Sequence, residues 1–350
     1  MKKWLIVLLV LVMVSAVVFY FVCNSRVSDE TGIGSADNRE HEIAFQPDTL
    51  EICSFNIQFL GSFKKRDNTA LADILKNFDI VVVQELVAPP FDGVYPDETA
   101  FTGDNEAALF FNAMTDHGFA YLLSEEDTGT GEKIHQKSTS TEWFVTFYKP
   151  ATVAFAADLP SGFLAEDRSD HPDYERVPYA FAFRSANNTL DFVLISVHLQ
   201  PGDRPAERRR RAHELQAIGN WINTRNTVEK DFIILGDMNI YDREELDSIT
   251  PAGYLSLNDE CRPTNTLSIS DKGAPYDHVM YSINHTLEID INYDLTVVNL
   301  VEIMRPYWTA DDPYPGDPYD HNLFKQYYSD HFPVVFRMIT PLRDDDGQHM

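Results

Sequence analysis

Two short polar segments carry residue types that could do chemistry, and each lies at the edge of an apolar run. Gly236-Asp237-Met238-Asn239 follows residues 232–235, and Ser329-Asp330-His331 precedes residues 332–336. Runs of β-branched and aromatic residues of this length indicate buried strands. A carboxylate or imidazole at the end of such a strand is held rigidly and still reaches a cleft.

Asn56 and Glu85 also stand at the ends of apolar runs, after residues 50–55 and 80–84. A carboxylate that follows buried positions is costly unless it is paired or bound to a metal. Oxygen ligands suit Mg²⁺, so we expect a metal role for Glu85. The alternatives are a helix-capping or solvent-facing role for Glu85 and a turn-forming role for Asn56.

Glu142 precedes the apolar run 143–148, and His198 ends the run 192–197. A carboxylate bonded to one imidazole nitrogen fixes the tautomer and raises the basicity of the ring, which makes it a usable acid or base. Asp277-His278 and Asp330-His331 are two further acid-histidine sites at strand edges, and they can supply a second pair of this type. Spacing alone does not decide which acid pairs with which histidine.

Asp237 and Asn239 are two residues apart, so in an extended segment both side chains point the same way. Together they could orient a water molecule and hold a phosphate oxygen, and the alternative is a simple turn. The basic run 208–211 lies near the start of a helix. We interpret its side chains as solvated or as packed through their aliphatic stems, with phosphate contact as the alternative. Collectively these groups suggest metal-assisted hydrolysis of a phosphodiester.

Strands alternate with a few long helices, and some strands follow each other directly, which indicates an α/β or α+β sandwich. The loops are expected in the Pro- and Gly-containing segments 85–141 and 306–328. The predicted helices are 68–78, 104–117 and 205–223. The predicted strands are 50–56, 80–84, 143–148, 179–184, 190–197, 231–236, 276–281 and 332–338.

The composition of the 350 residues, 44% hydrophobic and 24% charged, is that of a globular protein. There are 55 acidic and 28 basic residues, which gives a net charge of −27. This charge argues against long-range electrostatic capture of nucleic acid. It does not exclude a nuclease, because bound divalent cations supply local positive charge.

An uncharged apolar segment, residues 4–22, follows Lys2-Lys3 at the N-terminus. Its length fits a signal anchor, and a cleaved signal peptide or lipid attachment at Cys23 are the alternatives. With the lysines kept in the cytoplasm, the rest of the chain would be exported, membrane-anchored or secreted. The predicted organisation is an anchor or signal peptide (1–23), a polar tether (24–47), a folded domain (48–340) and a polar tail (341–350).

Two cysteines, Cys53 and Cys261, lie beyond residue 23. Cys53 falls in a strand pattern and is expected to be a buried small hydrophobe. A single bridge to Cys261 is possible in an oxidising compartment.

Seven ordered motifs resemble those of the endonuclease/exonuclease/phosphatase superfamily, most closely its deoxyribonuclease I-like branch. The resemblance covers roughly residues 49–338, and Arg176-Val177-Pro178 resembles the phosphate-contacting Arg-x-Pro of that branch. The motifs are Phe55-Asn56-Ile57-Gln58, Gln84-Glu85, Glu142-Trp143, Val197-His198, Gly236-Asp237-Met238-Asn239, Tyr276-Asp277-His278-Val279 and Ser329-Asp330-His331-Phe332-Pro333.

This resemblance implies a four-layer sandwich of two packed mixed β-sheets flanked by helices, with a cleft at one sheet edge. It implies a divalent metal, Mg²⁺ with Mn²⁺ or Ca²⁺ as alternatives, held near Glu85 and Asn56 together with Asp330. The chain is expected to be monomeric.

The resemblance further implies two acid/base pairs, His331 with Asp277 and His198 with Glu142. In addition, Asp237 would align the attacking water, Asn239 would hold the scissile phosphate and Arg176 would contact it. Which histidine is the base and which is the acid stays open at this point.

One position departs from the branch. The branch usually carries an Arg two residues after the metal-binding Glu, where this chain has Val87. This departure puts DNA specificity in doubt and leaves the hydrolytic centre intact. On the seven motifs, the first hypothesis is a DNA endonuclease with little sequence specificity, exported or tethered to a membrane. The second is a hydrolase of a phospholipid headgroup or other small phosphoester, and the third is a catalytically silent surface-binding protein.

Overall fold

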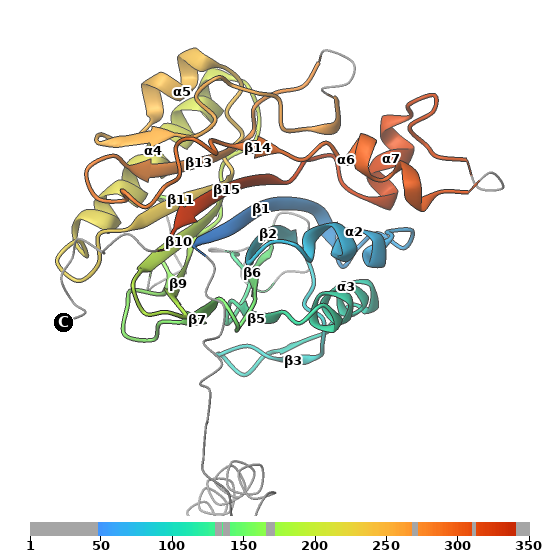
Figure 1. Ribbon diagram of the computed structural model, residues 1–350, viewed down its shortest axis with the longest axis horizontal. Coiled ribbons are helices and arrows are strands. Elements are labelled where there is room, and N and C mark those ends of the chain that lie inside the picture. The colour runs from blue at the N-terminus through green and yellow to red at the C-terminus, as the bar shows by residue number, and fades with distance from the viewer. Residues whose placement is uncertain are drawn as a thin grey trace, which may run out of the picture. The chain divides into compact units, whose positions relative to one another are not determined.

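Two mixed β-sheets pack face to face in the computed structural model, with helices on their outer surfaces (Figure 1). The structure describes residues 48–129, 135, 141–165, 172–267, 272–309 and 313–340. This α+β four-layer sandwich confirms the predicted fold class.

The predicted anchor (1–23), tether (24–47) and tail (341–350) lie outside the described residues. In the described part of the chain, no helix combines the length and the apolar character needed to cross a membrane.

The first sheet has six strands, of which the central pair is parallel and the others are antiparallel. The parallel pair is formed by the apolar runs predicted as strands near Asn56 and Glu85. In spatial order the strands are β14 (Thr296–Val297), β15 (Val334–Ile339), β1 (Thr49–Leu60), β2 (Ile80–Leu86), β6 (Trp143–Tyr148) and β5 (Ala120–Leu123).

The second sheet has seven strands and is also mixed, with one parallel pair, β10 and β11. β8 (Gly162–Phe163) pairs with β9 beside the main path of the sheet. The other strands, in spatial order, are β12 (Tyr254–Ser256), β13 (Asp277–Ser282), β11 (Phe232–Asp237), β10 (Asp191–His198), β9 (Tyr179–Ser185) and β7 (Val153–Phe155).

The main core fills the space between the two sheets. Ile52 and Val82 of the first sheet and Leu194 and Ile233 of the second are fully buried in one apolar cluster. Burial of a side chain of this size contributes about 1.5–3 kcal/mol relative to exposure. This shared core fixes the edges of the two sheets against each other.

Helices cover the outer face of each sheet. α2 (Asn68–Leu75) and α3 (Asn105–Asp116) pack on the first sheet, and α4 (Pro205–Asn223) and α5 (Arg243–Ile249) pack on the second (Figure 1). Leu215, Ile218 and Ile222 form a buried stripe along α4. Aspartate side chains cap the first turns of α2, α3 and α5, which satisfies backbone N–H groups that have no partner within the helix.

The long connecting segments contain short elements that the sequence did not predict. The segment 85–141 includes a two-stranded hairpin, β3 (Gly93–Val94) and β4 (Ala100–Phe101), in addition to β5. The C-terminal part includes α6 (Leu300–Ile303), the 3₁₀ helix η3 (Arg305–Tyr307) and α7 (His321–Tyr327).

Cys53 is buried in the core, as predicted, and Cys261 is partly exposed. Both thiols are free. The bridge considered from the sequence is therefore not formed.

Candidate active site

The second sheet places three predicted site residues side by side. His198 ends β10, Asp237 ends β11 and Asp277 begins β13. In the strand register His198 is the partner of Asp237, and Asp237 is the partner of Asp277. Backbone pairing alone therefore aligns an imidazole and two carboxylates at one edge of this sheet.

The first sheet supplies a corresponding set from the ends of its own strands. Asn56 in β1 pairs with Gln84 in β2, and Glu85 follows directly. Glu142 directly precedes β6, whose first residue pairs with Leu86. An amide and two carboxylates thus stand at the edge that faces the second sheet.

The backbone at Glu85 is irregular. The register between β2 and β6 shifts between Val83 and Leu86, and Glu85 has a φ of +65°. Its N–H donates to the carboxylate of Glu142. Irregularities of this kind re-aim side chains and concentrate at functional sites, where the surrounding structure must hold the strained conformation.

Gly236 permits the close approach of β11 to β10 directly before Asp237. Its φ is +141°, and a Cβ atom at this position would lie 2.1 Å from the carbonyl oxygen of Val197. Any other residue would push the two strands apart where His198 and Asp237 must stay adjacent.

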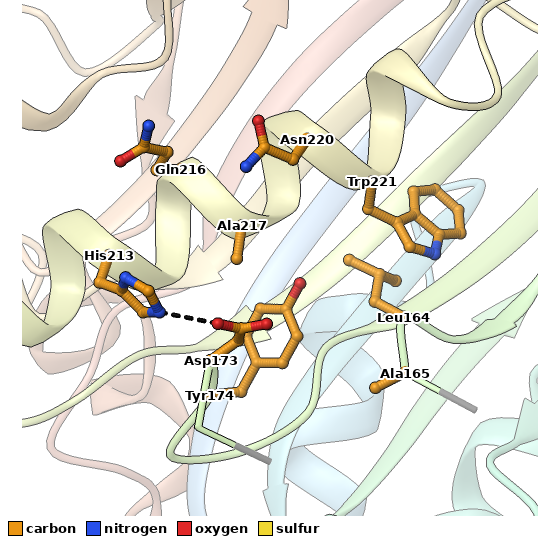
Figure 2. A pocket seen from close by; sticks show the side chains of 9 residues that line it. All are labelled: Leu164, Ala165, Asp173, Tyr174, His213, Gln216, Ala217, Asn220 and Trp221. Carbon is orange, nitrogen blue, oxygen red and sulfur yellow. Dashed lines mark hydrogen bonds and ion pairs between the residues drawn. The ribbon is translucent and has the colours of Figure 1, made fainter. Parts of the chain in front are cut away.

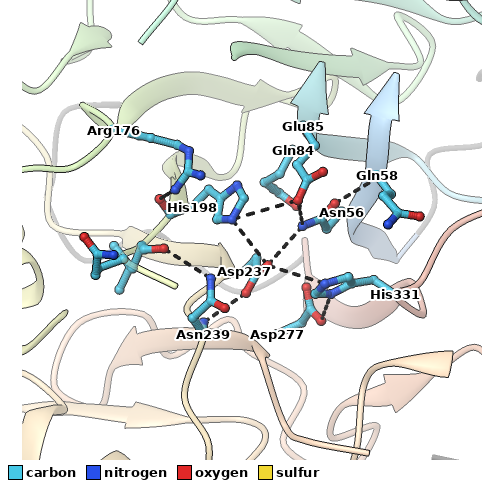
Figure 3. Close-up of polar contacts among 12 residues, drawn as sticks. Asn56, Gln58, Gln84, Glu85, Arg176, His198, Asp237, Asn239, Asp277 and His331 are labelled. Carbon is cyan, nitrogen blue, oxygen red and sulfur yellow. Dashed lines mark hydrogen bonds and ion pairs between the residues drawn. The ribbon is translucent and has the colours of Figure 1, made fainter. Parts of the chain in front are cut away.

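Asn56 joins the two sheets at the centre of the site (Figure 3). Its Nδ2 donates to Glu85 Oε1 at 2.9 Å and to Asp237 Oδ2 at 3.0 Å. Its Oδ1 accepts the backbone N–H of Gln58 at 3.0 Å. The amide thus holds together two carboxylates that would otherwise repel each other.

Both predicted carboxylate–histidine pairs come together, and each one spans the two sheets. His198 Nδ1 lies 2.9 Å from Glu142 Oε1, and His331 Nδ1 lies 2.8 Å from Asp277 Oδ2. The Nε2 atoms of the two rings both lie 3.5 Å from Asp237 Oδ2 (Figure 3). The two imidazoles thus converge on one point from opposite sides, although their roles stay predictions.

Burial and the neighbouring charges set the proton affinity of the first pair. Burial and Arg176 act to lower the pKa of His198, but Glu142 and Asp237 outweigh them and raise it above its ordinary value. Burial would raise the pKa of Glu142, yet His198 and Arg176 hold it below its ordinary value. Glu142 is therefore ionised at neutral pH.

The second histidine is more strongly affected. Burial acts to lower the pKa of His331, but Asp277 and Asp237 raise it well above the ordinary value. Among the residues that the structure describes, no Lys or Arg forms an ion pair with Asp277 or Asp237, so the imidazolium form is favoured.

Arg176 is held within the first pair rather than free in the cleft. Its Nε lies 3.1 Å from Glu142 Oε1, and its Nη1 donates to the carbonyl oxygen of His198 at 3.4 Å. Only 8% of its side chain is exposed. Its predicted contact with a substrate phosphate stays a prediction.

Asn239 is fixed from two sides and has a left-handed φ of +51°. Its N–H donates to Asp237 Oδ1 at 2.9 Å, and its Nδ2 donates to the carbonyl oxygen of Leu199 at 3.1 Å. The contact with Asp237 is thus made by the backbone N–H, while the side chain is held by Leu199, and the segment is not extended as the interpretation of the Asp-x-Asn spacing assumed.

Asp330 lies beside the centre and is partly exposed. Its Oδ2 accepts from Gln58 Nε2 at 2.6 Å. Burial raises the pKa of Glu85, and the charges of Asp330 and Glu142 raise it further, whereas His198 acts to lower it. Asp330 is thus electrostatically coupled to Glu85 without touching it.

Two overlapping groups of described residues could hold a cation. They are Glu85 with His198 and Asp237, and Asp237 with Asp277 and His331, each with its ligand atoms within 4.8 Å of one another. The predicted set of Asn56, Glu85 and Asp330 shares only Glu85 with them.

The donor chemistry of the site fits a divalent ion with oxygen ligands. The site holds more carboxylates than guanidinium groups, and burial raises the pKa of Glu85. An added cation would therefore relieve the repulsion between the carboxylates. The five carboxylate residues are Glu85, Glu142, Asp237, Asp277 and Asp330.

Sequence reasoning missed a buried arginine behind the first-sheet side of the site. Arg66 has a fully buried side chain that pairs with Glu106 at 2.6 Å. It also donates to the carbonyl oxygens of Ile57, Gln58 and Tyr328. The end of β1 and the segment that leads to Asp330 are tied together through this guanidinium group.

Arg211 has the same function behind the second-sheet side. It is fully buried, pairs with Glu245 at 2.6 Å and donates to the carbonyl oxygens of Gln200 and Gly202. These carbonyls belong to the segment that follows His198. The run 208–211 was interpreted as solvated or packed by its stems, so the full burial of the Arg211 guanidinium was not predicted, and Arg66 lies in an ordinary polar run that gives no signal of burial.

A separate cavity of about 300 Å³ lies beside α4 (Figure 2). Tyr174 and Trp221 line it, and His213 Nε2 lies 2.8 Å from Asp173 Oδ1 at its rim. None of the predicted site residues lines this cavity.

Comparison with known proteins agrees with the geometry. Residues 53–331 match the Endonuclease/Exonuclease/phosphatase family. The chain is 24% identical over 297 residues to a deoxyribonuclease of Thioalkalivibrio sp. (strain K90mix), with 81% of this chain and 70% of that protein covered.

Solved structures share the fold at low sequence identity. The human Nocturnin catalytic domain matches with a TM-score of 0.51 and 14% identity, covering 84% of this chain and 95% of that one. Bacteroides thetaiotaomicron mannosyl-6-phosphatase Bt3783 matches with a TM-score of 0.52 and 14% identity, covering 82% and 98%. With four-fifths of the sequence matched, the chain belongs to the endonuclease/exonuclease/phosphatase family of phosphoric ester hydrolases.

Proposed function

We propose that this protein is a Mg²⁺-dependent endonuclease that cleaves DNA with little sequence specificity. One observation carries the proposal, namely the two imidazole Nε2 atoms that each lie 3.5 Å from the same carboxylate oxygen of Asp237. The similarity to a deoxyribonuclease supports DNA as the substrate.

The two histidines have complementary tasks in this proposal. The carboxylates of Glu142 and Asp277 hold the Nδ1 atoms, so both Nε2 atoms are left to exchange protons in the cleft. One ring takes a proton from the attacking water and the other gives a proton to the leaving oxygen. Since His331 has the more strongly raised pKa and no arginine beside it, we assign it as the acid and His198 as the base.

Asp237 and Asn239 position the reactants. Asp237 lies between the rings and orients the water, and the amide of Asn239 beside it contacts a phosphate oxygen. Glu85 and Asp237 would hold the divalent ion, with Asn56 and Asp330 beside them. When bound, the ion supplies positive charge that polarises the phosphate and offsets developing negative charge.

Nicking of supercoiled plasmid by the full-length chain tests this function. We expect nicking with Mg²⁺, its loss with EDTA, and a drop of about 10²–10⁴-fold in the His198→Ala variant. His213→Ala is the matched control, because His213 is an exposed histidine on α4 that pairs with Asp173 and lines a cavity to which no site residue contributes. Absence of nicking by the wild type, or equal nicking by His198→Ala, would contradict the proposal.

A small phosphoester is the second candidate substrate. Val87 replaces the arginine that the deoxyribonuclease I-like branch usually carries, and no Lys or Arg is among the described residues that line the cavity at Val87. Turnover of phospholipid headgroups or sugar phosphates at a higher kcat/KM than DNA would favour this candidate.

The proposed enzyme acts outside the cytoplasm. The uncharged segment 4–22 after Lys2-Lys3 supports export with an N-terminal anchor. A reporter that is active only after export, fused to the C-terminus of the full chain, should be active. Activity of a cytoplasm-specific reporter at the same position would contradict the proposal.

A further inference from the structure

A buried carboxylate on α4 bridges two segments of the chain behind the second-sheet side of the candidate active site. The side chain of Glu214 is fully buried. Its Oε1 accepts the backbone N–H of Glu175 at 2.7 Å, and its Oε2 accepts the backbone N–H of Gln200 at 2.9 Å. Each oxygen of this carboxylate is thus bonded to a different segment.

Both backbone groups lie next to residues of the first carboxylate–histidine pair. Glu175 directly precedes Arg176, whose Nε lies 3.1 Å from Glu142 Oε1. Gln200 comes two residues after His198, whose Nδ1 lies 2.9 Å from the same oxygen. The two side chains therefore meet at one carboxylate in the site, and the segments that carry them meet at another carboxylate behind it.

Strand pairing does not hold these two segments to each other. The ladder between β9 and β10 ends at the pair of Tyr179 and Ser196. Beyond this pair, Arg176 Nη1 donates to the carbonyl oxygen of His198 at 3.4 Å, which is long for a hydrogen bond. Glu214 thus continues the connection between the two segments past the last paired residues.

The contacts of Glu214 differ from those of the other buried glutamates behind the site. Glu106 and Glu245 are each paired with a buried arginine. Among the described residues, the side chain of Glu214 accepts hydrogen bonds from the backbone alone. Burial raises the pKa of Glu214, and the two backbone donors act to lower it. Because a buried carboxylate is costly unless it is hydrogen-bonded, it favours the conformation in which both N–H groups face it.

We propose that Glu214 is a positioning residue of the active site, which fixes the backbone beside Arg176 against the segment that follows His198. The Arg176 guanidinium then stays in contact with Glu142, the carboxylate that holds the His198 ring. The inference rests on the function proposed above, because its consequence is the proton transfer by His198.

Glu214→Gln tests this bridge with almost no change in side-chain volume. The carboxamide keeps one acceptor oxygen, but its NH₂ group is a donor that faces the second backbone N–H, so one hydrogen bond is lost. We expect kcat for plasmid nicking by the full-length chain to fall about 10- to 100-fold, because small displacements near reacting groups have effects of this size. Glu214→Asp, which keeps both acceptor oxygens on a shorter stem, takes its place if thermal unfolding shows that Glu214→Gln does not fold.

A matched control separates positioning from a loss of stability. Glu229 is also fully buried and accepts two backbone N–H groups, those of Lys230 at 2.8 Å and Asp231 at 2.6 Å. It precedes β11 and therefore lies at the end of that strand opposite Asp237. Glu229→Gln should leave kcat unchanged, and an equal loss of kcat in Glu229→Gln and Glu214→Gln would overturn the inference.

The effect of Glu214 must also act through Arg176. In the Arg176→Gln background, Glu214→Gln should lower kcat by less than about 2-fold, because the group that it positions is already absent. Losses that multiply fully in the double variant would overturn the inference.

An NMR measurement in EDTA decides the inference without any cleavage of DNA. The ¹⁵N signal of the Arg176 Nε–H group, assigned by its absence in Arg176→Lys, reports how firmly the guanidinium is held in the full-length chain. Exchange of this proton with water should be at least about 10-fold faster in Glu214→Gln than in the wild type or in Glu229→Gln. Unchanged exchange would overturn the inference even if plasmid is nicked, whereas faster exchange supports it even if the wild type nicks no plasmid and the proposed function fails.

Discussion

The two carboxylate–histidine pairs have nearly the same geometry but different neighbours. In both, a carboxylate from one sheet contacts the Nδ1 of a histidine from the other, at 2.9 Å for Glu142–His198 and 2.8 Å for Asp277–His331. Arg176 contacts Glu142 in the first pair, whereas in the second the Thr264 hydroxyl donates to Asp277 at 2.6 Å. The positive charge of Arg176 opposes the effect of Glu142 on the pKa of His198. The Thr264 hydroxyl is neutral, so it does not oppose the effect of Asp277 on the pKa of His331 in this way.

A third buried histidine shows what burial does by itself. His278, the neighbour of Asp277 in β13, lies 2.9 Å from the hydroxyl of Ser256 and contacts no carboxylate directly. Burial lowers its pKa to about 4. Since all three rings are buried, the direction of each shift is decided by the contacting carboxylates rather than by burial.

Loss of either histidine of the two proposed acid/base pairs is the largest effect we predict. His198→Ala and His331→Ala should each lower kcat on DNA by about 10²–10⁴-fold, since each removes one proton-transfer group. The kcat of the double variant should be only slightly below that of the less active single variant, because the two rings act as one unit. Plasmid nicking under single-turnover conditions measures this, and fully additive losses would show that the two rings act independently.

Removal of the buried arginines compares the two sides of the site in terms of stability. Arg66→Met leaves the carboxylate of Glu106 buried without its cation, and Arg211→Met does the same to Glu245. Each substitution should lower the free energy of unfolding by about 3–5 kcal/mol. Urea unfolding measures the loss. The surface pair of Lys76 and Asp73 provides the control, since Lys76→Met should change stability little. A comparably small change in Arg66→Met would mean that this guanidinium does not hold the site.

The pH dependence of stability separates His278 from His331. The pKa of His278 is about 4 in the folded chain and about 6.5 unfolded, so the unfolded chain binds the extra proton between these values. The contribution of neutral His278 to the free energy of unfolding is fully present above pH 6.5 and is lost as pH falls through 4. The wild type should lose about 2 kcal/mol more than His278→Asn between pH 7.5 and pH 5 in urea unfolding.

The contribution of His331 to the free energy of unfolding depends on pH in the opposite direction, because its pKa is raised in the folded chain. This contribution is fully present below pH 6.5 and is lost as pH rises through the folded pKa. His331→Asn should therefore abolish the loss of stability that the wild type shows as pH rises above about 6.5, and leave the slope below pH 6.5 unchanged. Parallel pH profiles for wild type, His278→Asn and His331→Asn would contradict the contrast between the two rings.

The smallest predicted effect concerns Arg176. Because Arg176 lowers the pKa of His198, Arg176→Gln should raise that pKa and make the first pair resemble the second. NMR titration of the imidazole protons in EDTA measures the shift, with His331 as the internal control and Arg176→Lys as the charge-retaining variant. An unchanged or lowered value for His198 would show that Arg176 does not cause the difference.

Local sequence predicted most of the fold. The apolar runs that end at Glu85, His198 and Asp237 became strands within two residues of the expected bounds, because buried strands need continuous apolar residues. The strand predicted over 50–56 continues to Leu60, four residues beyond its predicted end. The short hairpin of β3 and β4 was not predicted, since its strands are too short to carry a pattern. The pairing of Glu142 with His198 came from the family resemblance, because no spacing rule connects residues 56 positions apart.

The sequence by itself determined which strands form and which polar residues end them, because these depend on local apolar patterns. The tertiary structure decided which groups meet. The Asn56 amide between Glu85 and Asp237, the Arg66 and Arg211 clamps and the Glu214 bridge all join distant segments. The physical reason is that proton affinity and cation binding depend on distances across the gap between the two sheets, which local pattern does not encode.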